Sequence, residues 1–239
     1  MATSPIAQFP GFSGTLLDSD QLRAHPCLKS LQIMVNDAFR EGNHDRFPTL
    51  DAVSATLGTH GRCIVIFRDT DVDRINPVAT AMIKYYNPAV GVDPIGVIHA
   101  NGRIESEHGY DSEPADLLSI TQWEPAAVAI LQDDPSLRKL GLAVYCVDQL
   151  EIDLLKRLEE ARKNPSAVSG AQSRSHTSAS SAKVQKLTLW IRAKQHLAPY
   201  WERRGYKLVH TKMYPKGIWG SQAELKIVTL KRDMLSSIE

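Results

Sequence analysis

Apolar residues recur with a helical period near the start of the chain. Within residues 19–41 they fall three or four positions apart, at Leu28, Leu31, Val35 and Phe39. This spacing predicts that residues 19–41 are mostly helix, and Pro26 marks a start or a kink because proline has no backbone N–H. A second short helix is expected over residues 49–57, where Thr49 can cap the first turn and Gly58 can end the last.

Other apolar runs predict strands and one long helix. Four runs rich in β-branched or alternating apolar residues predict strands over residues 62–68, 77–86, 126–131 and 187–193. Two more strands are expected over residues 207–219 and 222–231, joined by a hairpin at residues 217–220. A long helix is expected to begin at Leu142 and to end near Asn164-Pro165. Its apolar face carries Ala143, Val147, Leu150, Leu154 and Leu158.

The segments between these elements predict the domain organisation. Residues 1–18, punctuated by Pro, Gly and Ser, are expected to form an extended N-terminal arm, and residues 19–239 one domain. Residues 87–120 are rich in Gly, Pro and acidic groups, and we interpret them as an insertion near the mouth of the active site, with a short strand over 95–99. Residues 164–183 contain seven serines and almost nothing to bury, which predicts a disordered loop.

Composition and charge exclude several classes of protein. The 239 residues include 28 Lys and Arg against 27 Asp and Glu, interspersed along the chain. This balance indicates neither a basic nucleic-acid surface nor an acidic tail. No apolar run approaches the ~20 residues of a membrane helix, and the first residues lack the pattern of a signal peptide. Three widely spaced cysteines indicate buried thiols in a reducing, cytoplasmic compartment: Cys27, Cys63 and Cys146.

The loop before the long helix is a candidate phosphate site. Arg138 and Lys139 precede Gly141, and Ala143 follows in the first turn of the helix. A helix start leaves backbone N–H groups without intrahelical partners and carries partial positive charge, so it is suited to bind phosphate. Gly141 lets the backbone approach the phosphate, and the two cations can supply further donors. Short loops of this composition also occur in proteins that bind no phosphate.

Two motifs resemble those of one superfamily. Arg138-x-x-Gly141-x-Ala143 resembles the R/Q-x-x-G-x-G/A pyrophosphate loop of the GNAT superfamily of acyl-CoA N-acyltransferases. Near the C-terminus, the run from Trp201 to Tyr206, Trp-Glu-Arg-Arg-Gly-Tyr, is similar to the aromatic-Glu-Lys/Arg-x-Gly-Phe/Tyr turn of that superfamily. The Tyr-Trp-x-Arg-Arg-Gly-Tyr run and the Gly-Ile-Trp-Gly hairpin look most like a fungal branch. The resemblance implies a single α/β domain with a mixed, mostly antiparallel central sheet flanked by helices.

The resemblance also implies direct transfer of an acetyl or other acyl group from coenzyme A to an amine in a ternary complex. In such a fold, the strand over residues 126–131 separates from the strand over residues 187–193, and the freed backbone groups bind the pantetheine arm and polarise the thioester. The residues implied to bind coenzyme A are Ile130, Leu131, Asp133, Arg138, Lys139, Leu140, Gly141, Leu142, Ala143, Lys194 and Trp201.

Two positions depart from the pattern of the superfamily. Its usual acid is a tyrosine beside the sulfur, but this chain has Trp201 there, and an indole N–H cannot transfer a proton at useful pH. Tyr200, one residue earlier, can serve as the acid if the helix starts differently. Alternatively, Tyr200 and Trp201 only pack the short helix against the sheet. Lys194 stands where the superfamily often has an asparagine that contacts the cofactor.

Several residues are candidates for the general base. Glu124 precedes the central strand, and Asp133 and Asp134 follow it, so each can accept a proton directly or through water. His99 and His108 lie in the predicted insertion. Asp133 and Asp134 can instead cap the loop, and His99 can be an ordinary loop histidine. The sequence shows no Ser/His/Asp order, no Cys/His pair and no metal-ligand spacing.

The sequence therefore predicts an acetyl-CoA-dependent N-acetyltransferase acting on a small amine, with no nucleic-acid, membrane or metal partner. A protein-lysine substrate is less favoured, because no recognition tail or acidic docking surface is visible. One alternative is a GNAT-like fold that catalyses another small-molecule reaction without acyl transfer. The other is a non-catalytic protein that binds acyl-CoA. Neither the acceptor nor an oligomeric state has a signature in the sequence.

Overall fold

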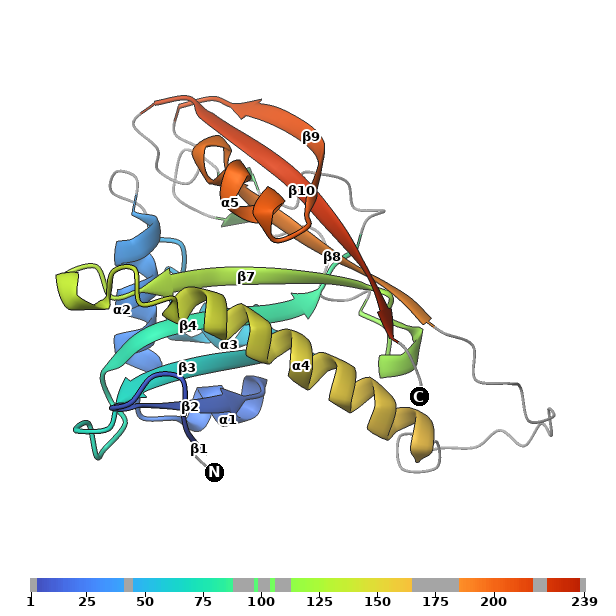
Figure 1. Ribbon diagram of the computed structural model, residues 1–239. Helices are drawn as coiled ribbons and strands as arrows, with labels where there is room; N and C mark the ends of the chain where they lie inside the picture. Colours follow the sequence, from blue (N-terminus) through green and yellow to red (C-terminus); the bar gives the residue numbers. More distant parts are fainter. Residues whose placement is uncertain are drawn as a thin grey trace.

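A twisted sheet forms the centre of the molecule (Figure 1). The computed structural model describes residues 4–40, 45–87, 97–98, 104–105, 113–164, 185–216 and 223–236. Within these residues the strands of the main sheet follow the order β1-β2-β3-β4-β7-β8-β10-β9. They are β1 Ser4–Pro5, β2 Phe12–Leu17, β3 Arg62–Arg68, β4 Pro77–Tyr85, β7 Gln122–Ile130, β8 Gln185–Lys194, β9 Lys207–Tyr214 and β10 Leu225–Ser236. A separate pair joins β5 Val97–Ile98 and β6 Ile104–Glu105.

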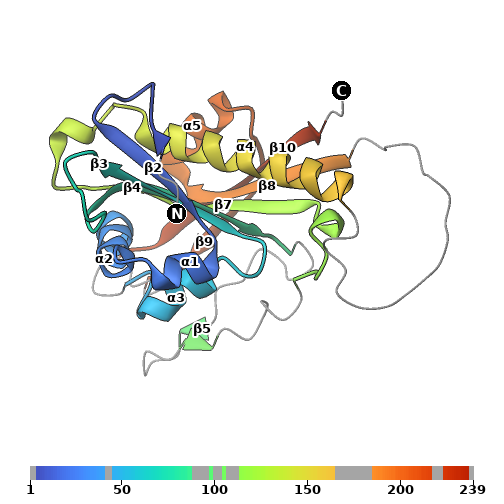
Figure 2. The same ribbon diagram turned by 90° about the horizontal axis from the view of Figure 1, so that it is seen from below.

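Helices cover both faces of this sheet (Figure 2). One face carries α1 Ser19–Ala24, α2 Leu28–Phe39 and α3 Leu50–Ala55, and the other carries α4 Leu142–Lys163 and α5 Ala198–Arg203. Short 3-10 turns are η2 Leu117–Ser119, η3 Pro135–Leu137 and η5 Gln195–Leu197. Neighbouring strands are antiparallel except β7 and β8, which are parallel. The predicted α/β class, with a mostly antiparallel sheet flanked by helices, is confirmed.

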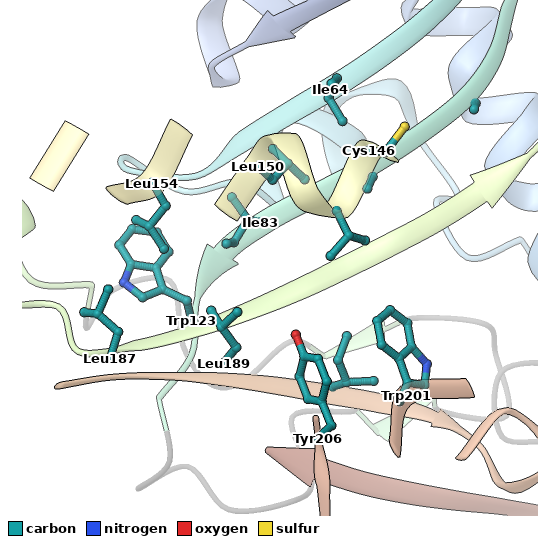
Figure 3. Close-up of a cluster of buried hydrophobic side chains, with 14 of the residues drawn as sticks. Ile64, Ile83, Trp123, Cys146, Leu150, Leu154, Leu187, Leu189, Trp201 and Tyr206 are labelled. Atoms are coloured by element: carbon teal, nitrogen blue, oxygen red, sulfur yellow. The ribbon is translucent and has the colours of Figure 1, made fainter. Parts of the chain in front are cut away.

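Each face of the sheet has its own apolar core. On the α4 side, Trp123 of β7 is fully buried and packs in one cluster with Leu150 and Leu154 of α4 (Figure 3). On the other side, the cluster joins helices α1, α2 and α3 to strands β2, β3, β4 and β7. Because both faces of β7 are buried, this strand is fixed in position, and it borders the site described below. No helix in the described part of the chain is long and apolar enough to cross a membrane.

Several elements differ from the sequence prediction. β7 covers residues 122–130 instead of 126–131, and β10 covers residues 225–236 instead of 222–231. The helical region expected over residues 19–41 is two helices, and the interruption lies at Pro26 as predicted, because His25 before it has an extended backbone (φ −80°, ψ 136°). Within the expected extended N-terminal arm, Phe12–Leu17 forms strand β2, which pairs along its length with β3. Its alternate residues Ser13 and Thr15 are buried, so this segment fills a place in the sheet although its inward side chains are polar.

Other expectations agree closely with the structure. The second helix is α3, capped by the hydroxyl of Thr49, and the long helix α4 begins at Leu142 as predicted. β3 has the predicted bounds, and β4 and β8 lie within two residues of theirs. The predicted hairpin at residues 217–220 and nearly all of the predicted serine-rich loop lie outside the described residues, as does most of the predicted insertion.

Candidate functional site

β7 and β8 lie side by side at only one end. Two residue pairs join them there, Gln122 with Thr188 and Trp123 with Leu189. Beyond these pairs, β7 continues beside β4 to Ile130, and β8 continues beside β10 to Lys194, so the two strands diverge into a wedge (Figure 1). Backbone groups that face the wedge have no partner in a β ladder between these strands. The predicted separation of the two strands is confirmed.

A β-bulge turns the backbone of β7 inside the wedge. The register between β4 and β7 shifts at Ala81, so that Ala127 and Val128 together oppose this one residue. Ala127 has a φ of 47°, a left-handed conformation that residues with a Cβ rarely adopt. Bulges re-aim the chain, and backbone strain of this kind is concentrated at functional sites. The bulge therefore presents peptide groups at an angle that a regular strand does not provide.

The loop from β7 to α4 connects the open end of the wedge with the N-terminus of α4. Gly141 is the N-cap, with a φ of 87°, and no side chain caps the helix. The carbonyl of Gly141 accepts the N–H of Tyr145 at 3.0 Å. The preceding N–H groups, those of residues 142–144, consequently have no intrahelical partner. Free N–H groups and the helix dipole make this end of α4 suited to an anion.

Side-chain hydrogen bonds hold the loop between β7 and α4 in place. Hydrogen bonds from Ser136 and Arg68 lower the pKa of Asp134, which also accepts the backbone N–H of Ser136 at 2.9 Å. Asp134 thus caps the turn η3, which is the structural role that the sequence left open for it. Arg138 donates to the carbonyl of Gln132 at 3.4 Å while its side chain stays exposed. The loop is therefore held in place and still presents a cation to solvent.

α5 lies on the same face of the sheet as α4. Trp201 is 5% exposed and packs edge-to-face on Tyr206, with ring centroids 5.5 Å apart (Figure 3). Tyr200 is half-buried and hydrogen-bonds with Arg204, whose guanidinium pairs with Asp148 of α4. Burial raises the pKa of Tyr200, so its phenol stays protonated at neutral pH. Trp201 thus packs against Tyr206, and Tyr200 places one phenol beside Arg204 and Asp148.

The opposite face of the wedge carries a buried ion-pair cluster. Glu124 follows Trp123 along β7, so its side chain points away from α4. Arg192 of β8 donates to the Glu124 carboxylate through Nε at 2.8 Å and Nη2 at 3.1 Å, and the Nζ of Lys84 lies 3.4 Å from it. Burial acts to raise the pKa of Glu124, but Arg192 and Lys84 outweigh burial and lower it. Glu124 is therefore an ionised carboxylate held by two cations.

Two aromatic rings border this cluster. Tyr86 and Trp190 stack with ring centroids 5.0 Å apart, and the indole N–H of Trp190 donates to Gln122 at 2.6 Å. Sequence reasoning missed Arg192, Lys84 and these rings. The signal was present in part, because polar or aromatic residues alternate with apolar ones along β8.

The structure places the remaining predicted site residues at the open end of the wedge or outside the described chain. Lys139 and Leu140 are exposed in the loop. The Leu142 side chain is buried, so only the backbone of Leu142 is available at the loop. Asp133 is exposed just after β7, and Lys194 ends β8. His99 and His108 are outside the described residues. Within the described part, no group of three or more His, Cys, Asp or Glu side chains could hold a metal ion.

Comparisons with known proteins give structural likeness only. No family model matches the chain, and no curated protein matches it. Among solved structures, the ribosomal-protein-S18-alanine N-acetyltransferase from Escherichia coli aligns over 95% of this chain and 96% of its own, at 11% identity and a TM-score of 0.49. Arabidopsis thaliana NAA60 in complex with acetyl-CoA aligns over 93% and 98%, at 11% identity and a TM-score of 0.49. An acyl-CoA N-acyltransferase from Pseudomonas aeruginosa aligns over 92% and 99%, at 14% identity and a TM-score of 0.44.

At these identities the likeness concerns the fold alone.

Proposed function

We propose that this chain is an acyl-CoA-dependent N-acyltransferase of the GNAT type, which transfers an acetyl group to a small amine in a ternary complex. One observation carries the proposal: a wedge between two parallel strands opens toward a helix start that has free N–H groups. An acyl donor with an anionic diphosphate and a narrow arm containing amides fits this arrangement, with the diphosphate at the helix start and the arm in the wedge. The same loop carries the Arg138-x-x-Gly141-x-Ala143 motif.

The residues of the loop suit a diphosphate. Backbone N–H groups of residues 142–144 would bind its oxygens, and Arg138 and Lys139 would add positive charge. Gly141 has no Cβ to obstruct the approach, and its left-handed φ favours glycine. Unpaired backbone groups of β7 and β8 would bind the amides of the pantetheine arm as an added strand does.

The bulge and α5 supply groups for the transfer. When bound, acetyl-CoA supplies the acyl group as an activated thioester. Peptide N–H groups turned out at Ala127 would stabilise negative charge on the acyl oxygen. As the amine forms the new C–N bond and the C–S bond breaks, Tyr200 would hold the proton for the leaving sulfur. The amine proton would pass through water to a carboxylate, for which Glu124 and Asp133 are the candidates.

The two carboxylates differ in placement. Glu124 lies on the face of the wedge opposite α4, where an acceptor would enter, but Arg192 and Lys84 make it a weak base. Asp133 is exposed beside the loop. From the sequence, we also propose that the chain belongs to a fungal-type branch of the superfamily and that it is cytoplasmic.

A non-catalytic acyl-CoA-binding protein is the second candidate. It is favoured by the buried Trp201 at the position where the superfamily has its acid.

Turnover separates the two candidates. The purified chain is incubated with acetyl-CoA and a panel of small amines, and free thiol and acetylated product are measured together. Stoichiometric release of thiol with formation of an amide supports the enzyme. Binding of acetyl-CoA without product across the panel supports the binding protein. If the chain neither binds acetyl-CoA nor forms an acetylated product, the proposal is contradicted.

A further inference from the structure

Arg192 uses only one edge of its guanidinium on Glu124. A guanidinium has five N–H donors in a plane, and the pair of Nε and Nη2 is engaged by the Glu124 carboxylate. Nη1 makes no hydrogen bond with any residue in the described part of the chain. The Arg192 side chain is 17% exposed, so the cluster is not sealed from solvent. The free end of the fork, formed by Nη1 and the second N–H of Nη2, can still accept a ligand.

The shape of this free end selects one kind of group. Its two N–H bonds are parallel and match the two oxygens of a carboxylate. Arg192 and Lys84 both contact the Glu124 carboxylate, so Glu124 fixes the position of the Arg192 guanidinium. A second carboxylate at the outer edge of Arg192 would therefore meet a cation that Glu124 already holds in position.

The cluster also lies at the right place in the wedge. Glu124 directly follows Trp123, the last residue of β7 that pairs with β8, so Arg192 stands where the two strands begin to separate. The cluster is on the face opposite α4, whereas the diphosphate loop is at the start of α4. If the acyl donor reaches through the wedge from the α4 side, an acceptor that enters from the opposite face meets Arg192.

We propose that Arg192 binds a carboxylate of the acceptor, and that the substrates are amines that also carry a carboxylate, as amino acids do. The proposal rests on the proposed N-acyltransferase function and names its substrate class. The stacked rings of Tyr86 and Trp190 form an apolar wall beside this anchor, against which the carbon chain of such an acceptor can pack.

The test compares acceptors that differ in one group. An amino acid, its primary amide and an aminoalkyl phosphate are offered at fixed acetyl-CoA, and kcat/KM is measured for each. We expect kcat/KM for the amino acid to exceed that for its amide by about 100-fold, because Arg192 can form a charge-assisted pair of hydrogen bonds with the carboxylate only. In Arg192→Lys, which keeps the charge and loses the fork, the preference should fall to less than about 10-fold, with little change for the amide.

Lys231→Met is the matched control, because it removes a cation that lies over Trp190 at 5.7 Å without contacting Glu124. Lys231→Met should keep the full preference for the amino acid over its amide. Equal use of amino acid and amide by the parent would overturn the proposal while acyl transfer stands, and so would a preference that Arg192→Lys leaves intact. A preference for the phosphate would overturn the choice of carboxylate. No binding of acetyl-CoA and no turnover with any amine would instead refute the proposed function, and this proposal with it.

Discussion

Replacing Glu124 by glutamine tests the buried cluster at the wedge. The change keeps the size of the side chain and removes its charge, leaving Arg192 and Lys84 near a neutral amide. The Glu124 side chain is 5% exposed, whereas Arg192 and Lys84 are 17% and 18% exposed. Removing one partner of a buried ion pair costs about 3–5 kcal/mol. Because both cations can be partly hydrated and glutamine keeps one acceptor oxygen, we expect a loss of about 2–3 kcal/mol.

The loss should depend on pH in a defined direction. The folded protein lowers the pKa of Glu124 from its ordinary value of 4.5, so ionised Glu124 stabilises the fold at pH values above 4.5. That stabilisation disappears as the pH falls through the lower pKa of the folded state. The difference in unfolding free energy between the parent and Glu124→Gln should therefore be largest near pH 7 and shrink below pH 4.5.

Urea unfolding, followed by tryptophan fluorescence at several pH values, measures this difference. Glu159→Gln on α4 is the control, because Glu159 and its partner Lys163 are 57% and 68% exposed and solvent screens such a pair, so its loss should leave stability nearly unchanged. A loss below about 1 kcal/mol for Glu124→Gln at pH 7, or a difference that grows on acidification, would refute the reasoning.

Three other substitutions test the packing, a buried polar contact and the backbone of the fold, each by urea unfolding. Leu154→Ala in the α4 core, where the side chain is fully buried, should cost about 2–5 kcal/mol; a cost below 1 kcal/mol would contradict the packing of α4 on the sheet. Asn36→Ala should cost about 2 kcal/mol, because Asn36 bonds both the N–H and the carbonyl of Phe47 at 2.8 and 3.0 Å; no loss would contradict these bonds. Ala127→Gly should leave stability unchanged or raise it by up to about 1 kcal/mol, because glycine accepts the φ of 47° without strain; a clear loss would contradict the left-handed bulge.

Local sequence signals account for the parts of the fold that were predicted well. Gly141 with the apolar stripe after it marks the start of α4, and the unbroken apolar run of β3 marks that strand. Capping and side-chain periodicity depend on neighbours within a few residues, so they can be read without knowing the tertiary structure.

The cluster of Glu124, Arg192 and Lys84 could not be predicted in the same way. Its members come from β7, β8 and β4, and their contact depends on the order and register of three strands. Sequence spacing does not determine long-range register. Glu124 was identified as a candidate base, but the cations that lower its pKa were not.

The N-terminal strand β2 was missed for a different reason. Its inward residues Ser13 and Thr15 are hydroxylated, so the segment lacks the apolar alternation of a half-buried strand. The hydroxyl of Ser13 accepts a hydrogen bond from Arg74, a partner 61 residues away that the local pattern does not reveal.

Calorimetric titration with acetyl-CoA tests the central claim most directly. The parent is compared with Arg138→Glu and Gly141→Glu, which place negative charge at the diphosphate loop, and with Arg23→Glu, which does so on α1 at a side chain 56% exposed. Saturable binding by the parent and by Arg23→Glu, weakened at least about tenfold in both loop variants that still fold, is the predicted result. No binding by the parent, or equal affinity in all four proteins, would contradict the assignment of the loop and wedge as an acyl-CoA site.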